Sequence, residues 1–182
     1  MELIKMNMED FDLVYSIMEK SFPVTEMRTY EYLKKQLEEP KFQIWLNKEK
    51  TTFIALWSFD KFDFIEHFAS EPEERGKGIG KEVLKEIIEK SGRTVVLEAE
   101  PAETEIQKRR INYYERAGFK VNGRYYFQPA MREDVEGIEL KILSCPEYLS
   151  DEEFEHVKST IYSEVYKIKK NWYYILYHIW EV

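Results

Sequence analysis

The segment that most constrains this chain is Glu73–Lys85, EERGKGIGKEVLK. An apolar run with strand character, DFIEHFAS, precedes it, and an amphipathic pattern typical of a helix follows it. Glycine lets backbone amides approach a ligand, and a helix that begins here points unpaired amides and its positive dipole end into the loop. The loop therefore has the features of a phosphate-binding site. It contains three glycines and three interleaved cations: Gly76, Gly78, Gly80, Arg75, Lys77 and Lys81.

Two common phosphate-binding patterns do not fit this loop. The P-loop pattern requires G-x-x-x-x-G-K-[ST], but Gly76 to Gly80 is one residue short and Glu82 follows the lysine. The dinucleotide fingerprint G-x-G-x-x-G also fails, because the spacing here is G-x-G-x-G. The pattern that remains is R-x-x-G-x-G, which begins at Arg75. Taken alone, this hexapeptide is equally consistent with a glycine-rich turn that carries solvated charges.

A second motif lies in RRINYYERAGF, between Arg109 and Phe119. It ends in Y-E-x-x-G-F, where Gly118 suits the end of a helix, and a strand-like run, VVLEAE, lies upstream. The loop and this motif together resemble the GNAT superfamily of acyl-CoA-dependent N-acetyltransferases. The resemblance covers about Ile65 to Phe119, with the motifs in the family's order.

The resemblance implies that acetyl-CoA is the acyl donor and that its pyrophosphate lies on the glycine loop. It also implies that the pantetheine arm pairs with the strand backbone at Phe68 and Ser70. Gln107 stands where many relatives have an asparagine that contacts the cofactor, which is a departure from the family pattern. The implied cofactor-binding residues are Phe68, Ala69, Ser70, Arg75, Gly76, Lys77, Gly78, Ile79, Gly80, Lys81, Gln107 and Tyr114.

Acetyl transfer to an amine needs a neutral amine and a proton for the departing thiolate. Tyr114 matches a tyrosine that acts as general acid in many relatives, and a phenol with a pKa of about 10 is protonated at neutral pH. Glu66 matches a glutamate that deprotonates the amine in many relatives. Partial desolvation beside Phe64 and Phe68 is expected to raise the pKa of this carboxylate. The alternatives are an aromatic packing role for Tyr114 and a surface or ion-paired role for Glu66.

His67 is a rival for the base, because the unperturbed pKa of histidine suits the task. Strand alternation predicts that Glu66 and Phe68 share one face, with His67 on the other, unless a bulge intervenes. A third alternative is that no base is needed and the site works by positioning. Glu98 and Glu100 share a face of the next strand, where they are suited either to meet a cationic amine or to balance surface charge.

Composition narrows the classes of partner and compartment. The chain has 27 basic and 35 acidic residues, a net charge of −8, which disfavours nucleic acid as a partner. Cys145 is the single cysteine and cannot form an intrachain disulfide, which fits a reducing cytoplasm. No apolar run reaches the ~20 residues of a spanning helix, and the N-terminus lacks the apolar region of a signal peptide, so no membrane association is expected. The three histidines are too scattered to suggest a metal site.

Periodicity predicts an α/β (α+β) fold: one GNAT-like domain with a mixed, mostly antiparallel twisted sheet flanked by helices. A meander of three strands is expected over residues 42–70, before the glycine loop. The expected strands are 2–6, 42–46, 51–59, 62–70, 95–100, 120–128 and 138–144. One helix is expected to begin after Asn7, and three more are expected over about 29–38, 78–90 and 104–117.

The acetyltransferase domain is expected to span residues 1–145, and residues 146–182 form a C-terminal extension. Ser150 with Glu153 three residues later signals a helix start, after which apolar residues recur on one stripe. The final run NWYYILYHIW is apolar on all sides, which suggests packing on its own domain or a homodimer contact.

These observations predict an N-acetyltransferase that transfers acetyl from acetyl-CoA to a primary amine of a small molecule by direct attack. Two alternatives stay open at this stage: a protein or peptide N-acetyltransferase, and a non-catalytic acyl-CoA-binding module. The sequence does not identify the acceptor.

Overall fold

The computed structural model describes residues 1–132 and 135–168. The chain divides into two compact units, Met1–Tyr148 and Leu149–Val182. The described residues of the first unit form the sheet and four α-helices, and they include both sequence motifs. The second begins with helix α5, Asp151–Thr160, and the predicted run NWYYILYHIW lies outside the described residues.

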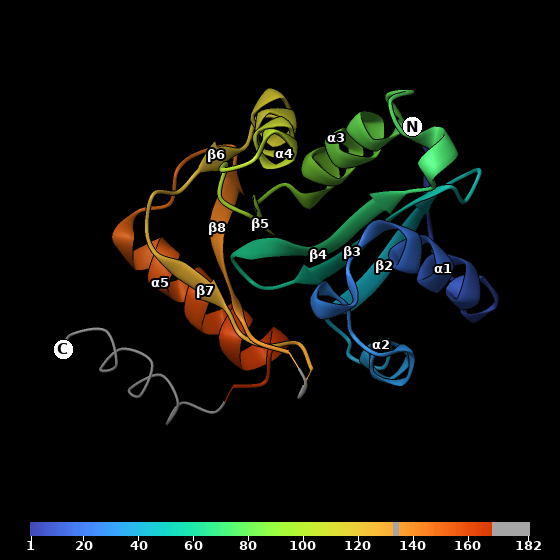
Figure 1. The fold of residues 1–182 in the computed structure, drawn as a ribbon, viewed down its shortest axis with the longest axis horizontal. Coiled ribbons are helices and arrows are strands. Elements are labelled where there is room, and N and C mark those ends of the chain that lie inside the picture. The colour runs from blue at the N-terminus through green and yellow to red at the C-terminus, as the bar shows by residue number, and fades with distance from the viewer. Residues whose placement is uncertain (133–134, 169–182) are drawn as a thin grey trace. The chain divides into compact units, whose positions relative to one another are not determined.

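The sheet has eight strands in the order β1-β2-β3-β4-β5-β8-β6, and β7 pairs with β8 beside this path. Of the strand pairs described, β4–β5 is parallel and the others are antiparallel, so the predicted mixed, mostly antiparallel sheet is confirmed (Figure 1). The meander expected before the glycine loop is formed by β2, β3 and β4. The strands are β1 Leu3–Lys5, β2 Phe42–Asn47, β3 Thr52–Ser58, β4 Phe62–Ser70, β5 Thr94–Ala99, β6 Lys120–Val121, β7 Tyr126–Gln128 and β8 Ile138–Cys145.

Helices cover both faces of this sheet. Helices α3, Ile79–Ser91, and α4, Glu105–Arg116, lie on one face, and α1, Phe11–Ser21, and α2, Tyr30–Gln36, lie on the other (Figure 1). The core beneath α3 and α4 is built from alternate strand residues and the inner side of each helix, including Ile54, Leu56, Ile65, Leu97, Leu143, Val83, Leu84, Ile87 and Ile111. Burial of this apolar surface is the main favourable term in folding.

The strand expected over residues 120–128 is interrupted. It forms two short strands, β6 and β7, which both pair with β8, and Asn122 is bonded to β8 just after β6 ends. Its amide donates to the Ile142 carbonyl at 2.9 Å, and its side-chain Nδ2 donates to the Ser144 hydroxyl at 2.9 Å. Side chains of asparagine compete with regular backbone pairing in this way, and Gly123 follows directly.

Helix starts agree with the cap residues in the sequence. Asn7 Oδ1 accepts from the amides of Glu9 and Asp10, although the first turn is a 3₁₀ helix that leads into α1. Ser150 and Glu153 form the predicted capping box of α5, and Thr104 with Gln107 forms another at the start of α4. Within the described residues, no helix has the length and apolar character needed to cross a bilayer.

The cap at Thr104 matters because α4 carries the Y-E-x-x-G-F motif. We expect Thr104→Ala to lower the free energy of unfolding by about 1 kcal/mol, since the Gln107 amide loses its side-chain acceptor. Thr104→Ser keeps the hydroxyl and serves as the control, with stability close to that of the parent. Urea unfolding followed by circular dichroism measures both, and equal losses in the two variants would contradict a capping role.

Candidate active site

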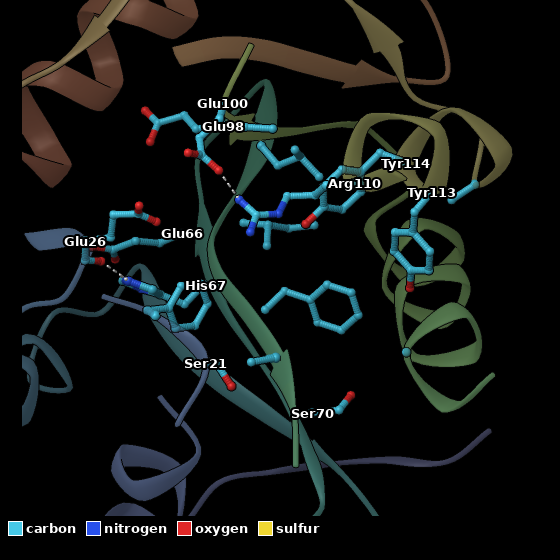
Figure 2. Close-up of a pocket in the computed structure, with 18 of the residues that line it drawn as sticks. Ser21, Glu26, Glu66, His67, Ser70, Glu98, Glu100, Arg110, Tyr113 and Tyr114 are labelled. Atoms are coloured by element: carbon cyan, nitrogen blue, oxygen red, sulfur yellow. Dashed lines mark hydrogen bonds and ion pairs between the residues drawn. The ribbon is translucent and has the colours of Figure 1, made fainter. Parts of the chain in front are cut away.

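A cleft opens in the sheet where β4 and β5 stop pairing. The two strands pair from Phe62 with Thr94 to Ile65 with Leu97. Beyond that point β4 continues alongside β3 and β5 alongside β8, and within residues 1–132 and 135–168 no strand pairs with the two edges that face each other. The cleft has a volume of about 630 Å³ and is bordered by both strands, the glycine loop, α4 and the turn after α1 (Figure 2).

The glycine loop borders one side of this cleft and opens α3. Gly76 and Gly78 have φ of +78° and +86°, the left-handed region that other residues rarely adopt, and Gly78 is the N-cap of α3. Gly80 is needed for a different reason. A Cβ there would lie 3.1 Å from the Tyr113 hydroxyl and 3.3 Å from Phe68 Cζ, so the helix backbone approaches these rings closely. The first amides of α3 have no partner within the helix, as at any helix start.

The three cations of the loop have three different environments. Arg75 Nε donates to the Ser70 carbonyl at 3.2 Å, and its guanidinium also donates to the Ser21 hydroxyl at 2.9 Å. Lys77 pairs with Glu74 at 2.9 Å and does not border the cleft. Lys81 borders the cleft and makes no ion pair within the described part of the chain. Arg75 therefore braces the loop against β4 and α1, while Lys81 is the cation available to a ligand.

Gln107, which was predicted to contact the cofactor, makes hydrogen bonds at the start of α4. Its Oε1 accepts from the Thr104 amide at 2.8 Å, and its Nε2 donates to Glu100 at 3.1 Å. The residue does not border the cleft. Because its amide group is committed to the start of α4, we do not retain Gln107 among the cofactor-binding residues.

Two tyrosines of α4, Tyr113 and Tyr114, border the cleft, and only Tyr114 was named as a site residue from the sequence. Both contact the core beneath α3 and α4, and their rings meet edge to face with centroids 5.4 Å apart. Burial raises the pKa of Tyr114 above the usual range and raises the pKa of Tyr113 to about 12. Both phenols are therefore protonated at neutral pH, and Figure 2 shows them on one side of the cleft.

A β-bulge overturns the predicted alternation of β4. Ala55 of β3 pairs with His67 while Leu56 pairs with Ile65, so Glu66 is an extra residue in β4. Ile65 and Phe68 face α3 and α4, whereas Glu66 and His67 both contact residues of the α1–α2 side. His67 lies opposite Phe68 as expected, but Glu66 lies with His67 instead of Phe68, which is the exception that the prediction allowed for a bulge.

Glu66 forms a buried ion pair with Arg28. Its side chain is 0% exposed, and its carboxylate accepts from Arg28 Nε at 3.2 Å, Gln36 Nε2 at 2.5 Å and Trp57 Nε1 at 2.7 Å. Burial acts to raise the pKa of Glu66, but the Arg28 charge and these hydrogen bonds outweigh it and lower that pKa. The predicted rise in pKa is therefore wrong, and we do not retain Glu66 as the base.

His67 is also buried, and its protonation state follows from its hydrogen bond. Nε2 lies 3.1 Å from the carbonyl oxygen of Glu26, which can only accept, so Nε2 carries the proton (Figure 2). Nδ1 is left with a lone pair and has no partner within the described residues. Burial lowers the pKa of His67, so the ring is neutral at pH 7.

Acidic side chains also border the cleft, and two of them, Glu98 and Glu100, were already noted from the sequence. Glu98 accepts a short hydrogen bond from the Tyr126 hydroxyl, and Glu100 pairs with Arg110 of α4 at 2.6 Å. Glu26, from the turn after α1, borders the same space. Sequence reasoning missed Glu26 and Arg110, since neither belongs to a motif and only the folded chain brings them to the cleft.

Comparison with known proteins agrees with this geometry. The sequence profile described as the Acetyltransferase (GNAT) family matches residues 11–119. The chain is 24% identical over 165 residues to YjbC of Bacillus subtilis (strain 168), a protein assigned as an acetyltransferase, which covers 87% of this chain and 84% of that protein. The chain belongs to the GNAT acetyltransferase family.

Solved structures share the fold. A Bacteroides thetaiotaomicron protein assigned to the GNAT family superposes with a TM-score of 0.85 at 28% identity, covering 93% of this chain and 100% of that one. The Escherichia coli ribosomal-protein-S18-alanine N-acetyltransferase gives 0.58 at 18% identity, covering 83% and 96%. A chimera of the Vibrio cholerae spermidine N-acetyltransferase SpeG gives 0.60 at 13% identity, covering 79% and 95%. At such identities the last two show the fold alone.

The buried pair at the bulge predicts a large stability effect. Arg28→Met is expected to lower the free energy of unfolding by about 3–5 kcal/mol, because it leaves the Glu66 carboxylate buried without its counter-charge. The double variant Arg28→Met/Glu66→Met removes both charges and is expected to recover much of this loss. Urea unfolding measures both variants. A single variant as stable as the parent would contradict the ion-pair interpretation.

The buried, neutral state of His67 leads us to expect that the free energy of unfolding depends on pH. The pKa of His67 is lower in the folded state than in the unfolded chain, so the unfolded chain binds a proton at a higher pH. The free energy of unfolding therefore decreases as the pH falls below the ordinary pKa of 6.5. Between pH 7.5 and 5.5 the parent should lose stability, whereas His67→Gln should be nearly flat. His156→Gln, at an exposed position of α5, is the control and should follow the parent. Urea unfolding at several pH values measures the free energy of unfolding of all three proteins. An equal dependence on pH in the three would show that His67 is not its source.

Proposed function

We propose that the protein transfers an acetyl group from acetyl-CoA to a primary amine of a small-molecule acceptor by direct attack. The observation that carries this proposal is that the helix-opening glycine loop and Tyr114 border one cleft between diverging strands. A phosphate-binding loop and a proton donor within one cleft are what acyl transfer from a coenzyme A thioester requires.

In this proposal the pyrophosphate lies on the amides of the loop, and Lys81 supplies a positive charge. The pantetheine arm pairs with the β4 edge that lost its strand partner, at Phe68, Ala69 and Ser70. Arg75 acts indirectly, because it holds the loop against the Ser70 carbonyl. The other loop residues contribute backbone: Gly76, Lys77, Gly78, Ile79 and Gly80.

Tyr114 acts as the general acid. The amine nitrogen attacks the thioester carbonyl carbon, the carbon–sulfur bond breaks, and the phenol gives its proton to the departing thiolate. A raised pKa keeps this proton in place until the thiolate forms. The Tyr113 hydroxyl lies where a Cβ on Gly80 would meet it at 3.1 Å, so we assign Tyr113 to shaping the cofactor end of the cleft.

We further propose that residues 1–145 carry this activity, with 146–182 as an extension, and that the enzyme works in the cytoplasm. The buried free thiol of Cys145 supports a reducing compartment. The fold neighbours act on spermidine and on ribosomal protein S18, so they favour neither a small molecule nor a protein as the acceptor.

Lys81 gives a test of cofactor placement with a matched control. Lys81→Glu should weaken acetyl-CoA binding by about tenfold or more, since it reverses a charge next to the pyrophosphate. Lys85→Glu, one turn further along α3 in an exposed pair with Glu89, should change binding little. Isothermal titration with acetyl-CoA measures both constants. Equal effects from the two variants would place the cofactor elsewhere.

Tyr114→Phe tests the chemistry. It keeps the ring and removes the proton donor, so turnover should fall by about 10²–10⁴-fold while acetyl-CoA affinity stays near that of the parent. Tyr113→Phe is the control, with a smaller loss of turnover. The assay follows release of the coenzyme A thiol with a panel of amines: spermidine, glucosamine, an amino acid and a short peptide. Unchanged turnover in Tyr114→Phe would reduce Tyr114 to a packing residue.

A further inference from the structure

Of the residues that the structure describes, five glutamates border the cleft, and hydrogen bonds or ion pairs hold four of them. Glu66 is buried against Arg28, and Glu74 pairs with Lys77 at 2.9 Å. Glu98 accepts from the Tyr126 hydroxyl, and Glu100 pairs with Arg110. A carboxylate held in this way has little capacity to accept a proton, because its partners favour the charged form.

Glu26 is the exception. Its carboxylate makes no hydrogen bond or ion pair within the described residues, although it borders the cleft and is half-buried. Figure 2 shows Glu26 beside His67, across the cleft from Tyr113 and Tyr114. Glu26 thus borders the cleft on the side opposite the proposed acid.

The surroundings of Glu26 suit a base. Burial and the negative charge of Glu100 raise its pKa above the ordinary range, and the Arg110 guanidinium opposes them more weakly. The charges that act on it most are Glu100, after β5, and Arg110 of α4. The other titratable groups that border this part of the cleft are Glu98 of β5 and Glu66 and His67 of β4 (Figure 2). With its pKa raised, the Glu26 carboxylate holds an accepted proton more firmly than an ordinary glutamate does.

The backbone of Glu26 is held in place by His67. The Nε2–H of this buried ring donates to the Glu26 carbonyl, and Arg132 Nε donates to the next carbonyl, that of Met27, at 2.7 Å. The turn Val24–Glu26 is therefore fixed from β4 and from the chain that follows β7. The bulge at Glu66 makes this possible, since it turns His67 toward the turn.

We propose that Glu26 is the general base for the acceptor and that the acceptor enters as a primary ammonium ion. This inference rests on the proposed acetyl transfer. Glu26 takes one proton from the ammonium, and the neutral nitrogen then attacks the thioester carbonyl carbon. The carbon–sulfur bond breaks, Tyr114 protonates the thiolate, and the tyrosinate regains a proton from the nitrogen. The protonated Glu26 releases its proton to water, so one proton leaves per acetyl transferred.

His67 is a positioning residue in this scheme, because it acts through the Glu26 backbone. His67→Gln keeps an N–H donor and should retain most activity, whereas His67→Ala removes it and should raise the KM of the acceptor more than it changes kcat. A structural role unconnected with Glu26 would instead affect both variants alike.

The test is the pH profile of kcat/KM in Glu26→Gln, measured with the best acceptor from spermidine, glucosamine, an amino acid and a short peptide. We expect kcat/KM at pH 7.5 to fall about 10²-fold or more, and the acidic limb of the profile to vanish. Glu26→Asp should restore part of the rate and the limb. Glu19→Gln, at an exposed position of α1, is the matched control and should leave the profile unchanged.

Acetyl-CoA affinity, measured by titration in each variant, distinguishes a failure of the proposed acetyl transfer from a failure of the role proposed for Glu26. A parent protein that binds no acetyl-CoA, or acetylates nothing in the panel, overturns the proposed function and this inference with it. A parent that turns over while Glu26→Gln keeps its rate and its acidic limb overturns the inference alone. Normal acetyl-CoA affinity with the limb lost in Glu26→Gln supports it.

Discussion

The separation of β4 from β5 after Ile65 and Leu97 is the constraint on which the rest of the structure depends. Two parallel strands that remained paired would leave neither a cleft nor a free backbone edge. Because each strand has a second neighbour, β3 for one and β8 for the other, the strands can part without losing their places in the sheet. The glycine loop then follows β4 directly, so phosphate-binding amides lie at one end of the cleft that the separation creates.

The bulge at Glu66 is the second feature on which the site depends. It shapes the side of the cleft where Glu26 lies and where we propose that the acceptor binds. It places two consecutive β4 side chains on the α1–α2 side of the sheet. One of them, Glu66, is buried against Arg28, while the other, His67, holds the Glu26 carbonyl. A buried ion pair contributes little net stability relative to apolar packing, but breaking it is costly. The pair therefore fixes the position of the turn after α1 more than it adds to stability.

Much of the fold could be predicted from the sequence, because strand periodicity, cap residues and the glycine spacing are local signals. Thr104, Ser150 and Asn7 cap helices as residues of their types usually do. The position of the bulge could not be predicted, since it depends on how β3 and β4 align across the sheet, and it places Glu66 on the face of His67 instead of that of Phe68. Glu26 was missed for the same kind of reason: its role depends on a cleft formed by residues far away in sequence.

The central claim is that this cleft holds acetyl-CoA with its thioester between Tyr114 and Glu26. A crystal structure of the complex with coenzyme A tests it most directly. The account predicts pyrophosphate oxygens within hydrogen-bonding distance of the amides of residues 76–81, and the sulfur in the cleft between β4 and β5. A cofactor bound away from the loop, or a sulfur on the far side of β4 from both residues, would contradict it.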